Sequence, residues 1–516
     1  MPLLTSAFTG PGPDTLDDWH LRDAQTHGHH GISLQKALDL VKDRKPTKVR
    51  VAIIDSGIDV NHEDLKGNVW INAKEVAGNG KDDDGNGYAD DMNGWNFMGR
   101  ADGTNMEHAN LELTRLYRKM APEMGKYADL KSVPKERQAD WKKFKDMETK
   151  IQQELTEAGG EYQQIKGLLV FYAKADSAFV SMFGDSYTPE QVAGVKSDDK
   201  KVQQMQAFML QMLGQGLTNA NLKKYVEYLE GKLQYNYNPE FIDRAVVGDD
   251  PDDFSNLRYG NADVAARQAD HGTHVAGIVG AMRGNKLGIE GIATNVEIMA
   301  LRAVPNGDEF DKDIAAAIRY AADNGARIIN MSFGKSYSAH PDKVHDAIRY
   351  AEQKGVLMVH AAGNDSENLD KAMNYPHPYY AFQKTPCTTW LTIGASSGTG
   401  KADFAGSFSN YGKKTVDVFS PGVQVYSLKP DNTYEHESGT SMAAPVTSGI
   451  AALVLSYFPN LTAVQLKEII LSSSVKYPKL KVTLPGTEDK MVPFKNLSRT
   501  GGVVNAYEAM KKAMTY

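Results

Sequence analysis

The sequence is poor in features that mark several common classes of protein. Its 516 residues include a single cysteine, Cys387, so no disulfide can form within the chain. The formal net charge is −7 at pH 7, which gives no basic footprint for nucleic acid. We therefore expect neither a disulfide scaffold nor a nucleic-acid partner.

The start and the middle of the chain also lack a long apolar run. The first residues, MPLLTSAFTGPGPDTLDDW, lack the basic start and apolar core of a secretory signal peptide. The most apolar stretch in the middle, GLLVFYAKADSAFVSMFG, carries Lys174 and Asp176, which argues against a membrane span. Hydrophobic residues still make up 41% of the chain. We expect one large domain with a sizeable core and an added module.

Apolar, β-branched runs alternate with helical patterns over much of the chain. The runs include VRVAIIDSGIDV, ARIINMSFG and GVLMVHAAGND, and helical patterns separate the later ones. This alternation predicts an α/β fold with a mostly parallel sheet between two helix layers. Asp55 and Asn364 stand where two of the strands end, which is the edge at which such sheets place their chemistry.

The stretch 104–242 reads differently, with no strand-like runs and with apolar residues at helical spacing. We expect a mostly helical insertion of four to six helices, with Gly159-Gly160 as one of its breaks. The sequence thus predicts an N-terminal segment at 1–48, a domain made of 49–103 and 243–516, and the insertion at 104–242.

Three short motifs suggest nucleophilic catalysis. Ser441 stands among small residues in SGTSMAAP, just before an apolar helical stretch, and could simply be a helix cap. His271 opens DHGTHVAGIVG, another small-residue helix, and Asp55 ends a buried strand. The order Asp, His, Ser is one of the orders found in catalytic triads.

The segments VAIIDSGIDVNHEDL, HGTHVAG and GTSMAAP together resemble the three motifs of subtilisin-like serine proteases, the subtilase family. The resemblance implies a subtilisin-like three-layer fold and serine endopeptidase activity, with Asp55, His271 and Ser441 as the triad. It also implies that the Ser441 N–H and the Asn364 side chain stabilise the oxyanion, although Asn364 alone could be a turn residue.

The same resemblance implies where a protein or peptide substrate lies. An extended substrate would add to a strand edge formed by Ser332, Phe333 and Gly334. The S1 pocket would be lined by Ala361, Ala362 and Gly363. Small residues there imply a roomy pocket and a preference for apolar or aromatic P1 side chains.

The acidic stretch KDDDGNGYADDMNGW (81–95) resembles the first half of a calcium loop. Asp82, Asp84 and Asn86 stand at the first, third and fifth positions. The further candidate ligands are Tyr88, Asp90 and Asp91. A solvated acidic turn is the alternative, and GDDPDDF (248–254) is a weaker second candidate. Because many subtilases carry stabilising calcium, we expect a structural calcium ion here.

The sequence leaves one alternative for the function open. The protein is either a general endopeptidase, or a processing protease or binding protein in which the helical insertion restricts access or recruits a partner. The resemblance implies a secreted or periplasmic location.

Overall fold

A computed structural model describes residues 16–184, 186–267, 269–379 and 385–516. Its contacts divide the chain into two compact units. The sheet unit consists of Thr15–Glu112 and Asp243–Tyr516, and the helical module contains Leu113–Ile242.

The sheet unit is built on one large sheet, which within the described ranges has nine strands in the order β10-β13-β7-β6-β5-β4-β1-β3-β2. Neighbouring strands are parallel except for β10 and β13. Its strands are β1 (Val49–Asp55), β2 (Gly94–Asn96), β3 (Val296–Arg302), β4 (Ile328–Met331), β5 (Leu357–Ala361), β6 (Trp390–Ser396), β7 (Val418–Pro421), β10 (Val475–Lys476) and β13 (Gly502–Val503). The predicted α/β class with a mostly parallel sheet is confirmed.

Two smaller hairpins accompany the large sheet. They are β8 (Val425–Lys429) with β9 (Thr433–Glu437), and β11 (Lys481–Thr483) with β12 (Met491–Pro493). The hairpin β8–β9 leads directly into the helix that carries Ser441.

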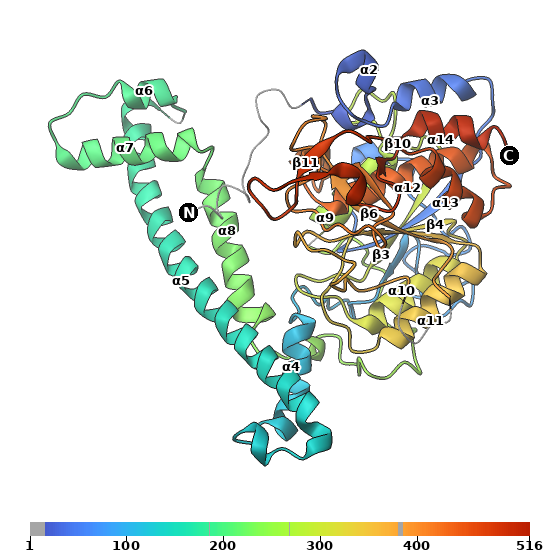
Figure 1. Cartoon of the computed structure of the whole chain (residues 1–516), viewed down its shortest axis with the longest axis horizontal. Coiled ribbons are helices and arrows are strands. Elements are labelled where there is room, and N and C mark those ends of the chain that lie inside the picture. Colours follow the sequence, from blue (N-terminus) through green and yellow to red (C-terminus); the bar gives the residue numbers. More distant parts are fainter. Residues whose placement is uncertain (1–15, 185, 268, 380–384) are drawn as a thin grey trace. The chain divides into compact units, whose positions relative to one another are not determined.

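Helices cover both faces of the large sheet (Figure 1). Alternate residues of β1 join two different apolar clusters, because successive side chains of a strand point to opposite faces. The elements of the sheet unit are α2 (Ala24–His27), α3 (Leu34–Val41), α9 (Asp270–Gly280), α10 (Asp311–Asp323), α11 (Pro341–Gln353), α12 (Thr440–Tyr457), α13 (Ala463–Ser472) and α14 (Ala506–Ala513). Residues of α9 and α12 pack in the cluster on one face, and residues of α10 and α11 in the cluster on the other.

The strand order reverses direction at β1. From β1 the chain reaches β2 and β3 on one side, and then crosses to β4 on the other side. Open parallel sheets bind ligands beyond the carboxyl ends of the strands at such a switch point. Asp55 ends β1 here, and Ser332 directly follows β4.

The segment that precedes β1 is an integral part of the sheet unit. Trp19 is buried, and its indole Nε1 donates to the Gln424 carbonyl at 3.0 Å. The Ala506 N–H donates to the Ile32 carbonyl at 2.8 Å, and α3 packs beside α14. The described residues before β1 therefore join the apolar cluster that contains residues of β1, α9 and α12.

The helical module comprises α4 (Glu112–Met124), α5 (Gln138–Phe183), α6 (Pro189–Ala193), α7 (Lys200–Gly214) and α8 (Asn219–Gly231), where α4 begins at the last residue of the sheet unit. The buried residues of α5 recur at intervals of three, four or seven, which is the spacing of a coiled-coil seam. They are Phe144, Met147, Ile151, Ala158, Ile165, Tyr172, Ala175 and Phe179.

The expected helix break at Gly159-Gly160 is wrong, since α5 runs through both glycines without interruption. Glycine in a helix interior costs about 1 kcal/mol relative to alanine. Packing of α5 against α8 supplies the compensation, with Tyr162 Oη donating to Glu230 at 2.8 Å and Lys232 paired with Glu154 at 2.9 Å. Tertiary packing therefore overrides the local preference.

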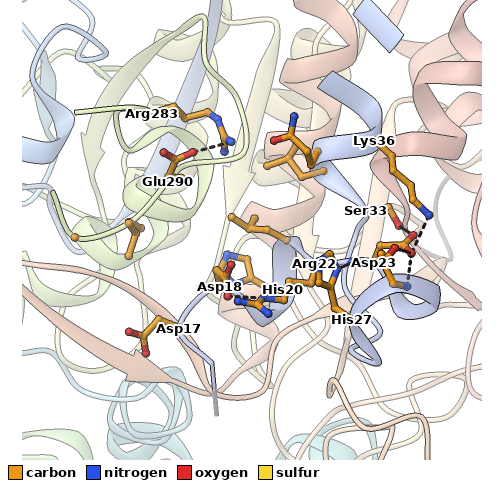
Figure 2. Close-up of a pocket in the computed structure, with 16 residues that line it drawn as sticks. Asp17, Asp18, His20, Arg22, Asp23, His27, Ser33, Lys36, Arg283 and Glu290 are labelled. Atoms are coloured by element: carbon orange, nitrogen blue, oxygen red, sulfur yellow. Dashed lines mark hydrogen bonds and ion pairs between the residues drawn. The ribbon is translucent and has the colours of Figure 1, made fainter. Parts of the chain in front are cut away.

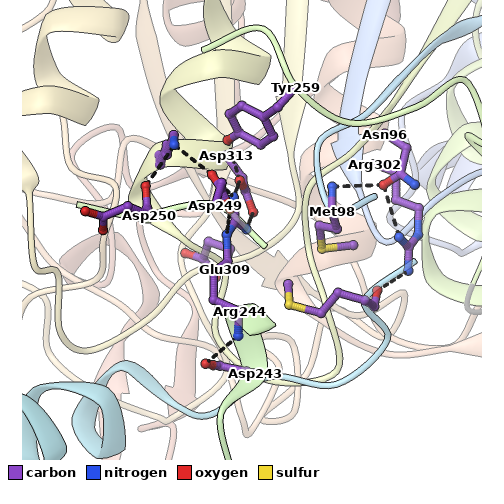
Figure 3. A network of polar contacts seen from close by, with 12 residues as sticks. Asn96, Met98, Asp243, Arg244, Asp249, Asp250, Tyr259, Arg302, Glu309 and Asp313 are labelled. Atoms are coloured by element: carbon purple, nitrogen blue, oxygen red, sulfur yellow. Dashed lines mark hydrogen bonds and ion pairs between the residues drawn. The ribbon is translucent and has the colours of Figure 1, made fainter. Parts of the chain in front are cut away.

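A buried ion network holds the segment where the chain re-enters the sheet unit (Figure 3). Arg244 pairs with Asp313 at 2.7 Å and with Asp249 at 2.6 Å, and Tyr259 Oη donates to Asp313 at 2.5 Å. Lys312 also pairs with Asp249, at 2.7 Å. The Asp249 carboxylate, in the acidic stretch 248–254, is thus paired with two basic side chains, those of Arg244 and Lys312.

Helix α12 has the length and apolar composition of a membrane span, alone among the helices of the described residues. However, 89% of that stretch is buried inside the fold, as is typical of a core helix.

Candidate active site

Asp55 and His271 form a hydrogen-bonded pair at the carboxyl edge of the sheet. Asp55 is the last residue of β1, and His271 is the second residue of α9. The Nδ1 atom of His271 donates to Asp55 Oδ1 at 2.7 Å, and the Ser56 N–H donates to the same oxygen at 2.8 Å. This bond fixes the imidazole tautomer and leaves Nε2 as the basic nitrogen.

The sequence lets α9 come this close because it has glycine at the contact. A Cβ added to Gly272 would lie 2.1 Å from the Gly57 carbonyl oxygen and 3.1 Å from Asp55 Cβ. Any side chain at this position would push the helix away from β1. Gly272 of the HGTHVAG motif therefore allows His271 to come within hydrogen-bonding distance of Asp55.

The pair is electrostatically biased toward the imidazolium. Asp55 is only 1% exposed, and within the described residues its buried Oδ2 has no hydrogen-bond partner. Burial opposes the charge on His271, but the Asp55 carboxylate outweighs it and raises the pKa of His271 to about 9. A base with this pKa is mostly protonated at neutral pH.

Ser441 lies in the first turn of α12. Its Oγ donates to the Ser332 carbonyl at 3.0 Å, and no hydrogen bond joins it to His271 in the part of the chain that the structure describes. An imidazolium cannot accept the hydroxyl proton. Proteolytic chemistry would require deprotonation of His271 and rotation of the hydroxyl, and such bonds commonly tighten only when substrate binds.

Asn364 contacts the start of the same helix. Its Oδ1 accepts from the Thr440 N–H at 2.9 Å and from the Thr440 hydroxyl at 3.0 Å. These two bonds fix the orientation of the amide, so its NH₂ group remains available as a donor. A Cβ on Gly439 would lie 3.5 Å from Asn364 Nδ2, so Gly439 adjoins this donor.

The six predicted substrate-binding residues differ in how exposed they are. Ser332 and Phe333 are buried, and their carbonyls already accept from Ser441 Oγ at 3.0 Å and from His360 Nε2 at 2.8 Å. Gly334 is exposed. Only the last of these three thus offers its backbone at the surface, because the other two support the serine helix and the core.

The predicted S1 residues are also partly structural. Ala361 and Ala362 are buried, and both carbonyls accept from the Asn374 side chain, at 3.2 Å and 3.0 Å. Gly363 is half-buried, and its N–H donates to the Thr440 hydroxyl at 3.0 Å. This bond links the end of β5 to the start of the serine helix.

The acidic loop brings together only some of the predicted ligands. Asp82 and Asp84 join Glu75, and one carboxylate oxygen of each lies within 4.8 Å of the others. Asp91 is instead buried, accepting from Asn86 Nδ2 at 2.9 Å and from Tyr320 Oη at 2.5 Å.

The other candidate ligands of this loop have different partners. Asp90 accepts from the backbone N–H groups of Asn79 and Gly80, at 3.1 Å and 2.7 Å. The Tyr88 ring packs in the core against Trp95 and Tyr320. Sequence reasoning missed Glu75, which precedes the aspartate cluster and accepts from the Asp83 and Asp84 N–H groups.

A cavity of about 600 Å³ lies elsewhere, between the segment 17–36 and the loop 283–290 (Figure 2). Asp55, His271 and Ser441 are not among the residues that line it. Charged side chains on its wall are paired with each other, as in Arg283–Glu290 at 2.7 Å. This cavity is therefore separate from the candidate triad.

The chain is similar to known proteins of one family. The model of the Subtilase family matches residues 47–490 of the chain. A thermophilic serine proteinase of Bacillus sp. (strain AK1) is 38% identical over 233 residues, which cover 45% of this chain and 49% of the relative. Subtilisin DY of Bacillus licheniformis is 37% identical, over 40% of this chain and 70% of the relative. Thermitase of Thermoactinomyces vulgaris is 35% identical, over 47% and 75%.

The chain therefore belongs to the subtilase family, the class of subtilisin-like serine endopeptidases. The resemblance drawn from the three motifs is confirmed. The aligned part spans about half the length of the thermophilic serine proteinase and covers less than half of this chain.

Proposed function

We propose that the protein hydrolyses peptide bonds through an acyl-enzyme, with Ser441 as nucleophile, His271 as general base and Asp55 as its partner. The observation that carries this proposal is the 2.7 Å bond between His271 and Asp55, at a switch point of the sheet where Ser441 begins a helix.

The reaction would begin with neutral His271. Its Nε2 takes the proton of the Ser441 hydroxyl as Oγ attacks the substrate carbonyl, and Asp55 stabilises the resulting imidazolium. The imidazolium then protonates the leaving amine, and the acyl-enzyme remains. Water, deprotonated by His271, attacks the acyl group and releases the second product.

The oxyanion would be stabilised by the Ser441 N–H at the start of α12 and by Asn364 Nδ2. The start of a helix offers unpaired N–H groups and a positive end of the helix dipole. We expect Asn364→Ala to reduce kcat about 100- to 1000-fold, that is by about 2.7–4 kcal/mol, with little change in KM. A larger change in KM than in kcat would assign Asn364 to substrate binding instead.

The nucleophile is tested by Ser441→Ala. We expect loss of labelling by a fluorophosphonate probe and a fall in kcat of about 10⁶-fold, because the triad acts as a unit. Ser438→Ala is the matched control, since Ser438 is exposed and its Oγ accepts from the Gln424 N–H at 2.8 Å. Cleavage that persists in Ser441→Ala, with the control unchanged, would refute the proposed nucleophile.

The substrate is an extended protein or peptide segment with an apolar or aromatic P1 residue. The small residues Ala361, Ala362 and Gly363 at the end of β5 support a roomy S1 site. A series of peptides that differ only at P1 tests this preference, and higher kcat/KM for an acidic or basic P1 would contradict it.

The acidic loop is proposed to bind one structural calcium ion through Glu75, Asp82 and Asp84. Their oxygens lie close enough to share one ion, since three atoms no more than 4.8 Å apart need only a small shift to reach the Ca–O distance of about 2.3–2.6 Å. The bound ion would supply positive charge that offsets the repulsion among the three carboxylates.

Thermal unfolding in EDTA and in calcium tests this site. We expect calcium to stabilise the sheet unit by about 2.7 kcal/mol at a hundredfold excess over Kd. Asp84→Asn should remove most of that effect, whereas Asp90→Asn, whose carboxylate binds backbone N–H groups, should keep it. An equal response of the two variants would exclude this ligand set.

A location outside the cytoplasm is proposed from the family resemblance. Cell fractionation of the native host with an antibody against the protein would test it.

A further inference from the structure

The hairpin β8–β9 links the histidine helix to the serine helix. The Ser427 hydroxyl donates to the His274 carbonyl at 2.8 Å, and His274 Nε2 bonds to the Glu435 carbonyl at 3.0 Å. A Cβ on Gly277 would lie 2.4 Å from Ser427 Oγ, so the hairpin lies directly against α9. Its last residue, Glu437, stands four residues before Ser441.

The Glu437 side chain lies beside the first turns of α9. Its Oε2 is 3.9 Å from Nδ1 of His274, which follows His271 by three residues and thus lies on the same side of the helix. Lys429, on the neighbouring strand β8, pairs with the other carboxylate oxygen of Glu437. The Glu437 and Lys429 side chains are only 24% and 11% exposed, so solvent screens their charges incompletely.

The titratable groups that act most strongly on His271, together with its neighbour His274, come from different elements. Asp55 comes from β1, Glu437 from β9, Lys429 from β8 and His274 from α9. Burial lowers the pKa of His274 to about 4, so it is neutral during catalysis. Burial disfavours the charge on Glu437, yet the charge that His274 carries at low pH and the Lys429 ammonium hold the pKa of its carboxyl below the usual range. Glu437 is thus an anion beside the first turns of α9, and Lys429 forms an ion pair with it.

We propose that Glu437 and Lys429 are positioning residues that set the charge of His271, with Glu437 as a second carboxylate favouring the imidazolium and Lys429 as its opponent. This inference rests on the proposed role of His271 as general base. Lys429 and Glu437 carry opposite charges, so their effects on His271 largely cancel. Loss of either residue leaves the charge of the other acting alone on His271.

The test is the pH dependence of kcat/KM on a small uncharged peptide substrate. Glu437→Gln should move the acid limb to lower pH, because the remaining Lys429 charge disfavours the imidazolium. Lys429→Met should move it to higher pH, because the unopposed Glu437 carboxylate favours the imidazolium. A shift of about half a pH unit changes kcat/KM about threefold on that limb, where the neutral fraction changes tenfold per pH unit.

Three further variants control the interpretation. Glu435→Gln removes a charge from the same strand, and its exposed side chain should leave the profile unchanged. Glu437→Asp keeps the charge and should keep most of the wild-type profile. The double variant Glu437→Gln/Lys429→Met should return close to wild type, since the opposing charges are removed together.

The outcomes separate this inference from the proposed function. Active variants whose acid limbs all coincide with wild type would overturn the role of Glu437 and Lys429 and leave the triad untouched. Shifts of both single variants in the same direction would also overturn it. If Ser441→Ala retained full activity, the proposed function itself would fail, whatever the hairpin variants did.

Discussion

The core helix α12 of the sheet unit and the long helix α5 of the helical module are both regular, but they differ in how many of their residues are buried. Nearly every residue of α12 from Thr440 to Ser456 is buried, and each meets a particular neighbour. The helix α5 buries a narrow stripe and exposes the rest. Many sequences can form a helix that is buried along one narrow stripe. Few can form a helix that is in close contact on all sides, so the sequence of the sheet unit is more restricted and contains recognisable motifs.

The largest effects should come from cavities made in each unit. We expect Leu453→Ala in α12 and Leu229→Ala in α8 each to cost about 2–5 kcal/mol, because both side chains are fully buried. The two losses should be separate. Hydrogen exchange should show lower protection in the sheet unit for the first variant and in the module for the second.

The activity of these variants sharpens the comparison. At a temperature where both units remain folded, Leu229→Ala should hydrolyse a small peptide at the wild-type rate. One cooperative transition that both substitutions lower equally would mean that the two units fold as a single body.

Replacing glycine by alanine should change stability in opposite directions in the two regions. Gly159→Ala in α5 should stabilise the module by about 0.5–1 kcal/mol, since a Cβ there meets nothing within 4 Å. Gly272→Ala in α9 should destabilise the sheet unit and reduce kcat, because its Cβ would lie 2.1 Å from the Gly57 carbonyl. Thermal unfolding and peptide kinetics measure both. A neutral Gly272→Ala variant would show that α9 can move without loss of the Asp55–His271 bond.

The sequence allowed the fold class and the family to be predicted because each motif combines a chemical residue with local structure. Asp55 ends an apolar strand, and His271 and Ser441 begin small-residue helices, so all three roles could be assigned from short segments. These roles in catalysis, with that of Asn364, remain predictions that the substitutions above test.

Other features depend on contacts between distant segments and could not be seen. Glu75 reaches the acidic loop from an earlier turn, outside the spacing of the calcium motif. Glu437 adjoins the serine motif, but its place beside α9 depends on how the hairpin β8–β9 folds. The segment 104–112 contacts the sheet unit through distant partners. Asn105 Nδ2 donates to Asp263 at 2.7 Å, and Met106 and Ala109 pack in an apolar cluster with Met98, Val247 and Phe310. Hydrophobic periodicity does not detect such links.

The smallest effect on stability should follow removal of the whole module. In the sheet unit, the Asn110 N–H donates to Asp243 at 3.0 Å, so the two points of attachment are adjacent. Within the module, the Thr114 hydroxyl donates to the Asn236 carbonyl at 2.8 Å, so its two ends are also held together. A folded insertion whose ends already match imposes little closure entropy on its host.

We therefore expect replacement of residues 113–242 by a Gly/Ser linker of about eight residues to change the stability of the sheet unit by less than about 1 kcal/mol. A disordered insertion of the same length would behave differently. Closure entropy costs about 0.6 kcal/mol per doubling of length, so shortening such a loop by about four doublings would stabilise the host by about 2.4 kcal/mol. Thermal unfolding of the shortened protein distinguishes the two cases.

The same variant tests whether the module restricts access. Peptide hydrolysis should be unchanged, because the Asp55–His271 bond and the start of α12 lie wholly within the sheet unit. Cleavage of a folded protein substrate should rise relative to that of the peptide if the module excludes bulky substrates. If replacement left both the peptide rate and the protein rate unchanged, the module would instead be assigned to partner binding. A loss of peptide hydrolysis would show that the catalytic site depends on the module.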